Sequence, residues 1–250
     1  MNDGFSRMAA LVGAAICLAG CATTHVQRQV QEDAAMTTGF LTKSVEVDGA
    51  TYFYSVYVPV DYDPAKSWPL VLFLHGMGER GGDGLLQTEV GIGTAIRRHA
   101  AWFPCIVVMP QCPDTCLWDG ATEVIDASLG QTREEYRIDP ARIYLTGLSM
   151  GGFGAWAYGA RHGDVFAALA PICGGGDLSD AARLAEIPIW AFHGADDDVV
   201  PPERSRKMVE AVKAAGGKVK YTEYPGVGHN SWDETYGNRK VITWLLRQRR

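Results

Sequence analysis

Apolar residues occur along the chain in short unbroken runs that alternate with longer amphipathic segments. The runs have the length and the bounding residues of strands that are buried on both faces, and they cover residues 68–74, 105–110, 143–146, 166–171 and 187–193. A further strand is predicted over 219–224. The amphipathic segments predict helices over 88–99, 121–137, 150–162, 202–215 and 234–249.

A different pattern precedes the first buried run. Residues 44–60 alternate between polar and apolar positions and contain Asp48-Gly49, which is typical of two antiparallel strands joined by a tight turn. Beyond them, buried strands alternate with helices, which indicates an α/β fold with a mostly parallel central sheet and helices on both faces. The segment 172–186 is short and rich in glycine, so we expect no lid domain there.

The first residues read as an export signal, because Arg7 is followed by an apolar stretch over 8–19 that is too short to span a bilayer. Leu18-Ala19-Gly20-Cys21 resembles the lipobox of bacterial lipoproteins, in which the cysteine carries the lipid. Ala22 then favours the outer membrane over the inner membrane. The alternatives are an ordinary signal cut near Cys21 or a buried helix.

The expected organisation is a signal peptide over 1–20, a lipidated Cys21 with a polar tether over 21–38, and one catalytic domain over 39–250. A chain of 250 residues with 47% hydrophobic content suits one large core. The net charge of −6 argues against a nucleic-acid partner. The sequence carries no signal for a particular oligomeric state.

Four cysteines fall in the expected domain: Cys105, Cys112, Cys116 and Cys173. Export permits disulfides, and four cysteines allow three connectivities. Cys112 and Cys116, which flank a predicted loop, are the best pair. A zinc site would need histidines at ligand spacing nearby, and the sequence has none there.

The chemistry centres on Gly147-Leu148-Ser149-Met150-Gly151, where a predicted strand turns into a predicted helix. This G-x-S-x-G pattern is typical of a nucleophilic serine held at a sharp turn, with glycines where a side chain would clash. The simpler interpretation is a glycine-rich turn that happens to contain serine. A serine nucleophile needs a base in hydrogen-bond reach and an acid that orients the base.

His229 is the candidate base, because it lies in a flexible loop between the last strand and the last helix. His75 and His193 also follow strands, but glycine comes next in both, so we expect them to support turns from within. Asp197 is the candidate acid, with Asp196 as the alternative. Asp198 is expected to cap or brace the following loop, and three adjacent carboxylates suit a calcium site poorly.

The order serine, acid, histidine is that of the α/β-hydrolase fold. The stretches 74–81, 110–113, 170–176 and 228–232 resemble the esterase relatives of prolyl oligopeptidase and dienelactone hydrolase. This resemblance implies that the backbone N–H groups of Met77 and Met150 form the oxyanion hole. Dienelactone hydrolases proper carry cysteine at the position of Ser149, so the serine points to ordinary ester cleavage.

Trp118, Trp232 and Val200 are the expected substrate-binding residues, and each tryptophan could equally be core packing under a loop. Glu79 and Arg80 are expected to form an ion pair that braces their loop.

The sequence predicts a serine esterase that cleaves short-chain or aryl esters without a cofactor or a metal. Acetyl or feruloyl groups on polysaccharide are plausible substrates, and the lipid anchor is the expected membrane partner. The alternatives are a serine peptidase of the prolyl oligopeptidase-like group and a non-catalytic surface-anchored binding module.

Overall fold

The computed structural model describes residues 37–250, and residues Thr38–Arg250 form one compact unit. The expected signal peptide, the lipidation site at Cys21 and nearly all of the expected tether lie outside the described residues. Within the described part of the chain, no helix is both long enough and apolar enough to cross a membrane.

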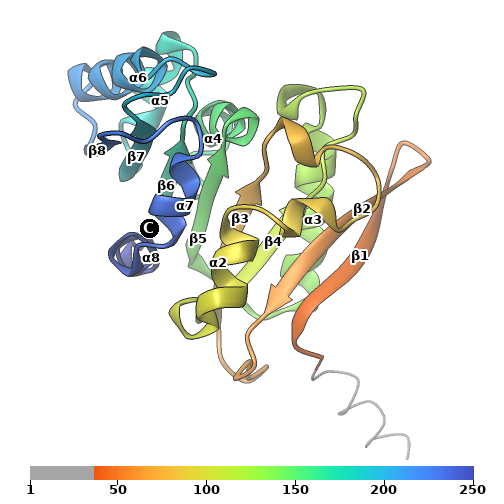
Figure 1. The fold of residues 1–250 in the computed structure, drawn as a ribbon. Helices are drawn as coiled ribbons and strands as arrows, with labels where there is room; N and C mark the ends of the chain where they lie inside the picture. The colour runs from red at the N-terminus through yellow and green to blue at the C-terminus, as the bar shows by residue number, and fades with distance from the viewer. Residues whose placement is uncertain (1–36) are drawn as a thin grey trace, which may run out of the picture. The chain divides into compact units, whose positions relative to one another are not determined.

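An eight-stranded sheet forms the centre of the unit, in the order β1-β2-β4-β3-β5-β6-β7-β8 (Figure 1). Strands β1 and β2 pair antiparallel, β2 joins β4 antiparallel, and all other neighbours are parallel. The strands are β1 Gly39–Val47, β2 Ala50–Val58, β3 Trp68–Leu74, β4 Ile106–Pro110, β5 Ile138–Leu148, β6 Ala168–Ile172, β7 Ile189–Gly194 and β8 Val219–Tyr224.

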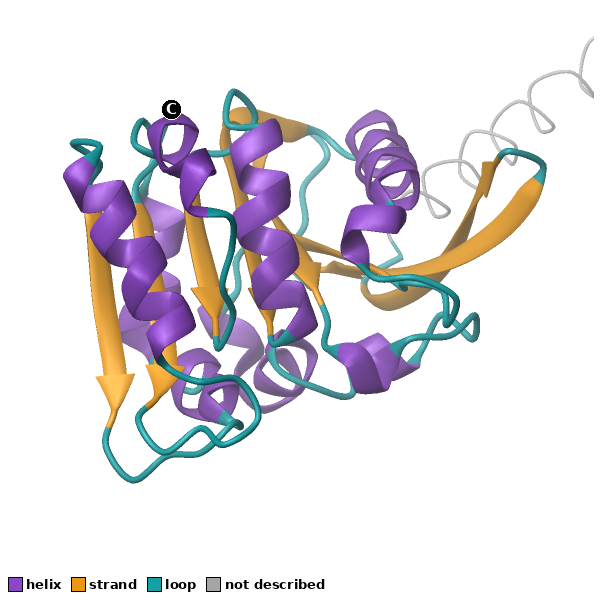
Figure 2. Cartoon of the chain, turned by 90° about the horizontal axis from the view of Figure 1, so that it is seen from above, coloured by secondary structure: helices purple, strands orange, loops and turns teal. Residues whose placement is uncertain are grey.

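Helices cover both faces of the sheet, as the alternating pattern predicted (Figure 2). Leu70, Leu72 and Leu74 of β3 face one core, and Val71 and Phe73 face the other. The first core is closed by α3 Thr122–Glu135, α4 Met150–Arg161, α5 Ala181–Leu184 and α6 Glu203–Ala214. The second is closed by α2 Ile92–His99, α7 Ser231–Tyr236 and α8 Arg239–Arg247.

The hairpin turns where the sequence indicated. Asp48 and Gly49 both have positive φ, 51° and 78°, which matches the right-handed twist of the flanking strands. However, β1 already begins at Gly39, five residues before the expected start at Ser44. The polar residues Thr42 and Lys43 hid this strand, because an edge strand need not be apolar.

Two helices differ from their predicted bounds by more than two residues. The predicted helix over 88–99 begins only at Ile92, because Gly91 precedes it with a φ of 56°. The predicted helix over 234–249 is two helices, which are separated at Gly237 and Asn238. The side chain of Asn238 accepts from the N–H of Lys240 and so caps the start of α8.

Between β6 and β7 the chain forms only a 3-10 turn over Leu178–Asp180 and the short helix α5. No lid domain is inserted there, in agreement with the expectation for 172–186. The loops after β3, β5, β7 and β8 therefore meet at the carboxyl edge of the sheet without a cover, which is where ligands bind in open α/β sheets.

Candidate active site

Ser149 occupies a sharp turn between β5 and α4. Its φ of 52° is rare for a residue with a side chain, and it is the local strain that this kind of turn requires. A Cβ on Gly147 would lie 2.2 Å from the carbonyl oxygen of Gly151, and one on Gly151 would lie 1.9 Å from that of Leu74. The two glycines are therefore needed for close packing, as the sequence predicted.

The backbone N–H of Ser149 is already engaged. It donates to the carbonyl oxygen of Ile172 at 3.0 Å and approaches Cys173 Sγ at 3.3 Å. Met150 begins α4 and Met77 begins a 3-10 turn, so the N–H groups of these two residues lack partners within their helices. Both residues line the same cavity as Ser149.

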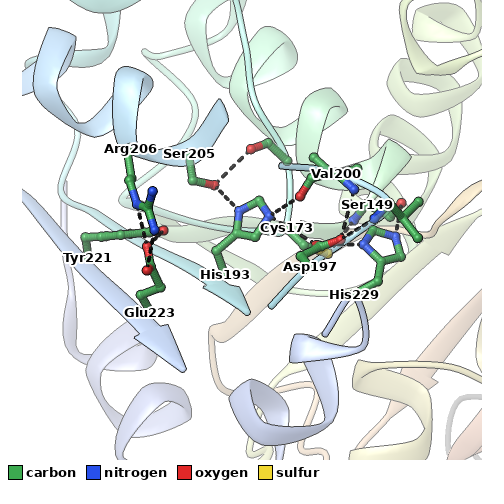
Figure 3. A network of polar contacts seen from close by, with 12 residues as sticks. Ser149, Cys173, His193, Asp197, Val200, Ser205, Arg206, Tyr221, Glu223 and His229 are labelled. Carbon is green, nitrogen blue, oxygen red and sulfur yellow. Dashed lines mark hydrogen bonds and ion pairs between the residues drawn. The ribbon is translucent and has the colours of Figure 1, made fainter. Parts of the chain in front are cut away.

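The three side chains singled out in the sequence form one hydrogen-bonded chain (Figure 3). His229 Nε2 lies 2.9 Å from Ser149 Oγ, and His229 Nδ1 lies 2.8 Å from Asp197 Oδ2. The carboxylate can only accept, so Nδ1 carries a proton and Nε2 is free to accept from the serine. This is the tautomer that a general base needs.

Asp197 is buried, whereas Asp196 and Asp198 are exposed. Burial alone would raise the pKa of Asp197, but hydrogen bonds from His229 and from the N–H groups of Val200 and Val199 outweigh it and hold the pKa below its usual value. Asp197 Oδ1 takes the two N–H groups at 2.9 and 3.0 Å.

The expected role of Asp198 is wrong, because α6 has no side-chain cap and Asp197 itself braces the loop. The sequence could not show which of three adjacent aspartates turns inward.

His75 supports a turn from within, as expected. Its Nδ1 donates to the carbonyl oxygen of Gly76 at 2.6 Å, and its Nε2 accepts from the N–H of Cys112 at 2.9 Å. Burial lowers the pKa of His75 to about 4, so the ring is neutral. The carbonyl of His75 accepts from Trp118 Nε1 at 3.0 Å.

The expected ion pair between Glu79 and Arg80 is absent from the described structure. Arg80 instead donates to the carbonyl oxygens of Met77, Asp114 and Cys116, which ties the loop after β3 to the loop after β4. Glu79 turns toward the cavity, and burial raises the pKa of its carboxyl group.

A cavity of about 740 Å³ opens beside Ser149, within the range of small-molecule sites. Trp118, Trp232 and Val200 line it, so all three predicted binding residues lie where the sequence placed them. Trp118 is nevertheless buried and donates to the carbonyl of His75, so it also packs under a loop, and its contact with substrate stays a prediction.

Sequence reasoning missed other cavity residues: Leu117, Phe153, Ala157, Gly175, Gly176, Glu79, Asp119 and Asp177. Phe153 and Ala157 lie one turn apart on α4, so the helical spacing after the serine turn was the signal that could have found them.

All four cysteines of the domain are free thiols, so the expected disulfide between Cys112 and Cys116 is wrong. Cys112 is buried and contacts the carbonyl oxygen of Cys116 with its sulfur at 3.6 Å. Burial raises the pKa of Cys112 to about 12, which makes it an unreactive packing residue.

Among residues 37–250, one group of possible metal ligands gathers within 4.8 Å, namely Cys173, Asp197 and His229. Asp197 and His229 are already bonded to each other, and burial raises the pKa of Cys173 to about 12. A protonated thiol is a poor metal ligand. We therefore explain this cluster by the hydrogen bonds that join Ser149, His229 and Asp197, and not by a metal site.

A family model matches the part of the chain that carries the three hydrogen-bonded residues. Residues 114–237 match the model of the dienelactone hydrolase family. This part of the chain is similar to dienelactone hydrolase family domains. The matched region includes Ser149, Asp197 and His229, and it excludes the loop that carries Met77.

Relatives of this chain include proteins that are ester hydrolases by name. It is 32% identical over 158 residues to the bifunctional acetylxylan esterase/xylanase XynS20E of Neocallimastix patriciarum, a match covering 61% of this chain and 22% of the relative. It is 24% identical over 200 residues to the probable feruloyl esterase C of Aspergillus niger, covering 77% of this chain and 73% of the relative.

Among solved structures, a thermostable esterase is similar with a TM-score of 0.78 and 41% identity, covering 84% of this chain and 63% of the esterase. A feruloyl esterase module of Clostridium thermocellum has a TM-score of 0.69 at 17% identity over 86% of this chain and 92% of the module, which shows the shared fold alone. The chain has the α/β-hydrolase fold. It spans less than two thirds of the length of the thermostable esterase and of the acetylxylan esterase/xylanase.

Proposed function

We propose that this chain is a serine hydrolase of carboxylic esters that works through an acyl-enzyme. The observation that carries the proposal is the pair of hydrogen bonds that links Ser149 to His229 and His229 to Asp197. The two contacts measure 2.9 and 2.8 Å and lie at the wall of an open cavity. A serine beside a correctly protonated histidine, itself held by a carboxylate, is an arrangement for nucleophilic attack.

In the first step Ser149 Oγ attacks the ester carbonyl carbon while His229 Nε2 takes the serine proton. The C–O bond to the alcohol then breaks, and His229 returns the proton to the leaving alcohol. In the second step water attacks the acyl-serine ester, His229 takes a proton from that water, and the acid leaves as Ser149 recovers its hydroxyl. Asp197 keeps its charge throughout and stabilises the imidazolium.

The N–H groups of Met77 and Met150 are the proposed oxyanion donors. Each begins a helical turn at the cavity, and donors of this kind contribute about 2.7–4 kcal/mol each to transition-state stabilisation. His75 fixes the first donor indirectly, because it holds the carbonyl of Gly76, which belongs to the same peptide unit as the N–H of Met77. That peptide plane is rigid, so holding its oxygen also orients its N–H.

The cavity favours short or aryl acyl groups. Its walls carry Leu117, Trp118, Phe153 and Trp232, which give an apolar surface with aromatic groups. The names of the relatives, acetylxylan esterase and feruloyl esterase, support acetyl or feruloyl groups on polysaccharide as the natural substrates.

The charge of the cavity narrows the substrate class further. Glu79, Asp119 and Asp177 contribute carboxylates to the lining, and none of the lining residues is lysine or arginine. Nearby negative charge repels an acyl group that itself bears a carboxylate. We therefore infer that the preferred acyl groups are uncharged.

Initial rates on matched substrates test the proposed function. Purified protein should hydrolyse p-nitrophenyl acetate, methyl ferulate and acetylated xylan, and Ser149→Ala should abolish all three activities. The matched control is Ser179→Ala, which removes an exposed serine outside the cavity lining. Wild-type protein inert to every ester would contradict the proposal, and faster cleavage of p-nitroanilides than of esters would favour a peptidase.

We further propose that Cys21 anchors the domain to the cell envelope, on the strength of the lipobox resemblance alone. Cells fed an alkyne fatty acid should label the wild-type protein and leave Cys21→Ser unlabelled. Equal labelling of both would contradict the anchor.

A further inference from the structure

A second histidine touches the proposed triad acid from the side opposite His229 (Figure 3). His193 lies at the end of β7, four residues before Asp197, and its side chain is fully buried. Its Nε2 is 3.1 Å from Asp197 Oδ2 and 2.9 Å from the carbonyl oxygen of Val200. Both partners can only accept, so Nε2 must carry a proton.

The Nε2 proton faces two acceptors in the loop over 195–202 between β7 and α6, which we call the acid loop. Asp197 Oδ2 lies between His229 Nδ1 and His193 Nε2, at 2.8 and 3.1 Å. The carbonyl of Val200 accepts from His193, while the N–H of Val200 donates to Asp197 Oδ1 at 2.9 Å. His193 therefore contacts the Asp197 carboxylate directly. It also binds Val200, whose N–H donates to the same carboxylate.

The other ring nitrogen connects the acid loop to the nucleophile turn. His193 Nδ1 lies 2.7 Å from Ser205 Oγ on α6, and Ser205 Oγ lies 2.8 Å from the carbonyl oxygen of Gly174. Gly174 packs so closely that a Cβ there would lie 2.5 Å from the carbonyl carbon of Gly152 in the first turn of α4. Its neighbour Cys173 contacts the N–H of Ser149.

We propose that His193 is a positioning residue of the active site, which aligns Asp197 for His229 through its Nε2–H and couples its own protonation to that of His229. This inference rests on the proposed function, because it assigns a role in the same triad. His193 does not line the cavity, so it acts on the reaction only through Asp197 and Val200.

The coupling follows from counting protons. Three contacts need one proton each: Nε2 to Val200, Nδ1 to Ser205, and Ser205 to Gly174. A neutral ring and the serine hydroxyl supply two, so one contact is left without a proton. An imidazolium and the serine hydroxyl together supply all three, and the imidazolium places its charge 3.1 Å from the Asp197 carboxylate. Burial opposes that charge and is the main reason why the pKa of His193 is lowered.

The groups around His193 leave Asp197 as the anion that responds to it. On β8, Glu223 is the strand partner of His193, but its carboxylate is bonded to Arg206 at 2.6 and 2.8 Å and to Tyr221 at 2.7 Å.

On the remaining sides, the residue after β6 contributes the Cys173 thiol, which burial keeps protonated, and the loop before α7 contributes His229. Positive charge on either histidine disfavours positive charge on the other, because both face the same carboxylate oxygen. At acid pH, a proton gained by His193 therefore places positive charge at Asp197 Oδ2, the oxygen that accepts from His229 Nδ1.

Two substitutions separate the positioning role from simple packing. The amide nitrogen of glutamine can replace Nε2, whereas that of asparagine can replace only Nδ1. His193→Gln should retain kcat within about threefold, and His193→Asn should lower kcat by about 10–100-fold with KM unchanged, since misplacement of the catalytic groups affects the chemical step. Thermal unfolding and fluorophosphonate titration of active sites check that both variants are folded.

The pH profile provides a readout that packing alone would not change. In wild type, log(kcat/KM) should steepen on the acid side from a slope of about one toward about two, and His193→Gln should keep a slope of about one. Equal loss of kcat in both variants, or wild-type kcat and an identical acid limb in both, would overturn the proposal.

A measurement without turnover keeps this inference distinct from the esterase proposal. Titration of ¹⁵N-histidine signals should show two mutually coupled transitions for His229 and His193 in wild type, and a single transition for His229 in His193→Gln. If the protein hydrolyses no ester but the coupling is present, the proposed function fails and the coupling of His193 stands. If esters are cleaved but the His229 curve is the same in both proteins, the inference about His193 fails alone.

Discussion

A buried histidine followed by glycine lies at the carboxyl end of both β3 and β7, as the first residue after β3 and near the last residue of β7, yet the two histidines have different surroundings. His75 meets one acceptor and one donor, the carbonyl of Gly76 and the N–H of Cys112, so a neutral ring satisfies both contacts. His193 meets acceptors alone at Nε2 and a shared hydroxyl at Nδ1, so no neutral tautomer satisfies all of its network.

The difference shows that the local sequence places a histidine, while partners from loops and helices decide its chemistry. The partner of His75 Nε2 comes from the loop after β4, and the partners of His193 come from its own loop and from α6. The first loop holds the proposed oxyanion donor, and the second holds the proposed acid. Both loops thus use a buried histidine to fix a group that faces the reaction.

The largest expected effect is on the acid of the second loop. Asp197→Asn should lower kcat by about 10⁴-fold, because the amide disfavours the tautomer of His229 that leaves Nε2 free to accept. Asp196→Asn is the matched control and should leave kcat within about twofold, since Asp196 is exposed and makes no side-chain contact with His229. Steady-state kinetics on p-nitrophenyl acetate measures both. The reverse ranking would move the acid to Asp196.

A smaller effect is expected from the first loop. His75→Leu leaves the carbonyl of Gly76 and the N–H of Cys112 buried without partners, at about 1–3 kcal/mol for each group. Chemical denaturation should show this loss of unfolding free energy, and kcat should fall about tenfold as the peptide of Met77 loosens. His99→Gln, outside the active-site loops, serves as the control. Unchanged stability and kcat would remove His75 from the account.

The same residue gives a pH dependence with a definite sign. Folded His75 has a pKa of about 4 and the unfolded group about 6.5, so between these values the unfolded state binds more protons. The contribution is present above pH 6.5 and is lost as pH falls toward 4, by about 3 kcal/mol in total. Denaturation curves of His75→Leu across this range should lack that part of the wild-type slope. Parallel curves would contradict the assignment.

The smallest expected effect concerns the charge of the cavity. Mono-p-nitrophenyl succinate and p-nitrophenyl butyrate have acyl chains of the same length and differ in a terminal carboxylate. We expect kcat/KM to be about fivefold lower for the charged ester at low salt, with the gap narrowing at high salt. Glu79→Gln should reduce the gap, and Asp114→Asn, outside the lining, should not. Equal rates for the two esters would show that the cavity carboxylates are too well solvated to select.

Patterns that depend on neighbouring residues were predictable from the sequence. A buried run gave β3 to the residue, the further strand predicted over 219–224 matches β8, and Gly147 with Gly151 gave the turn that presents Ser149. Chain order also placed His229 and Asp197 correctly. Asn238, whose side chain caps a new helix, shows the limit, because a capping residue inside an amphipathic pattern does not interrupt its periodicity.

Features that depend on distant partners were not predictable. Arg80 does not pair with its neighbour Glu79. It donates to one carbonyl of its own loop and to two carbonyls of the loop after β4, since three hydrogen bonds outweigh one solvated ion pair. Cys112 and Cys116 are close in sequence, but Cys112 is directed into the core. His193 could be placed in its turn, but its contact with Asp197 depends on how the acid loop folds back.

The central claim is that Ser149 is the nucleophile, and the site of covalent capture tests it most directly. Incubation with a fluorophosphonate followed by peptide mass spectrometry should place one phosphonyl group on Ser149. The adduct should be absent in Ser149→Ala and strongly slowed in His229→Gln. An adduct on another residue, or no adduct in folded wild-type protein that binds the probe, would contradict the account.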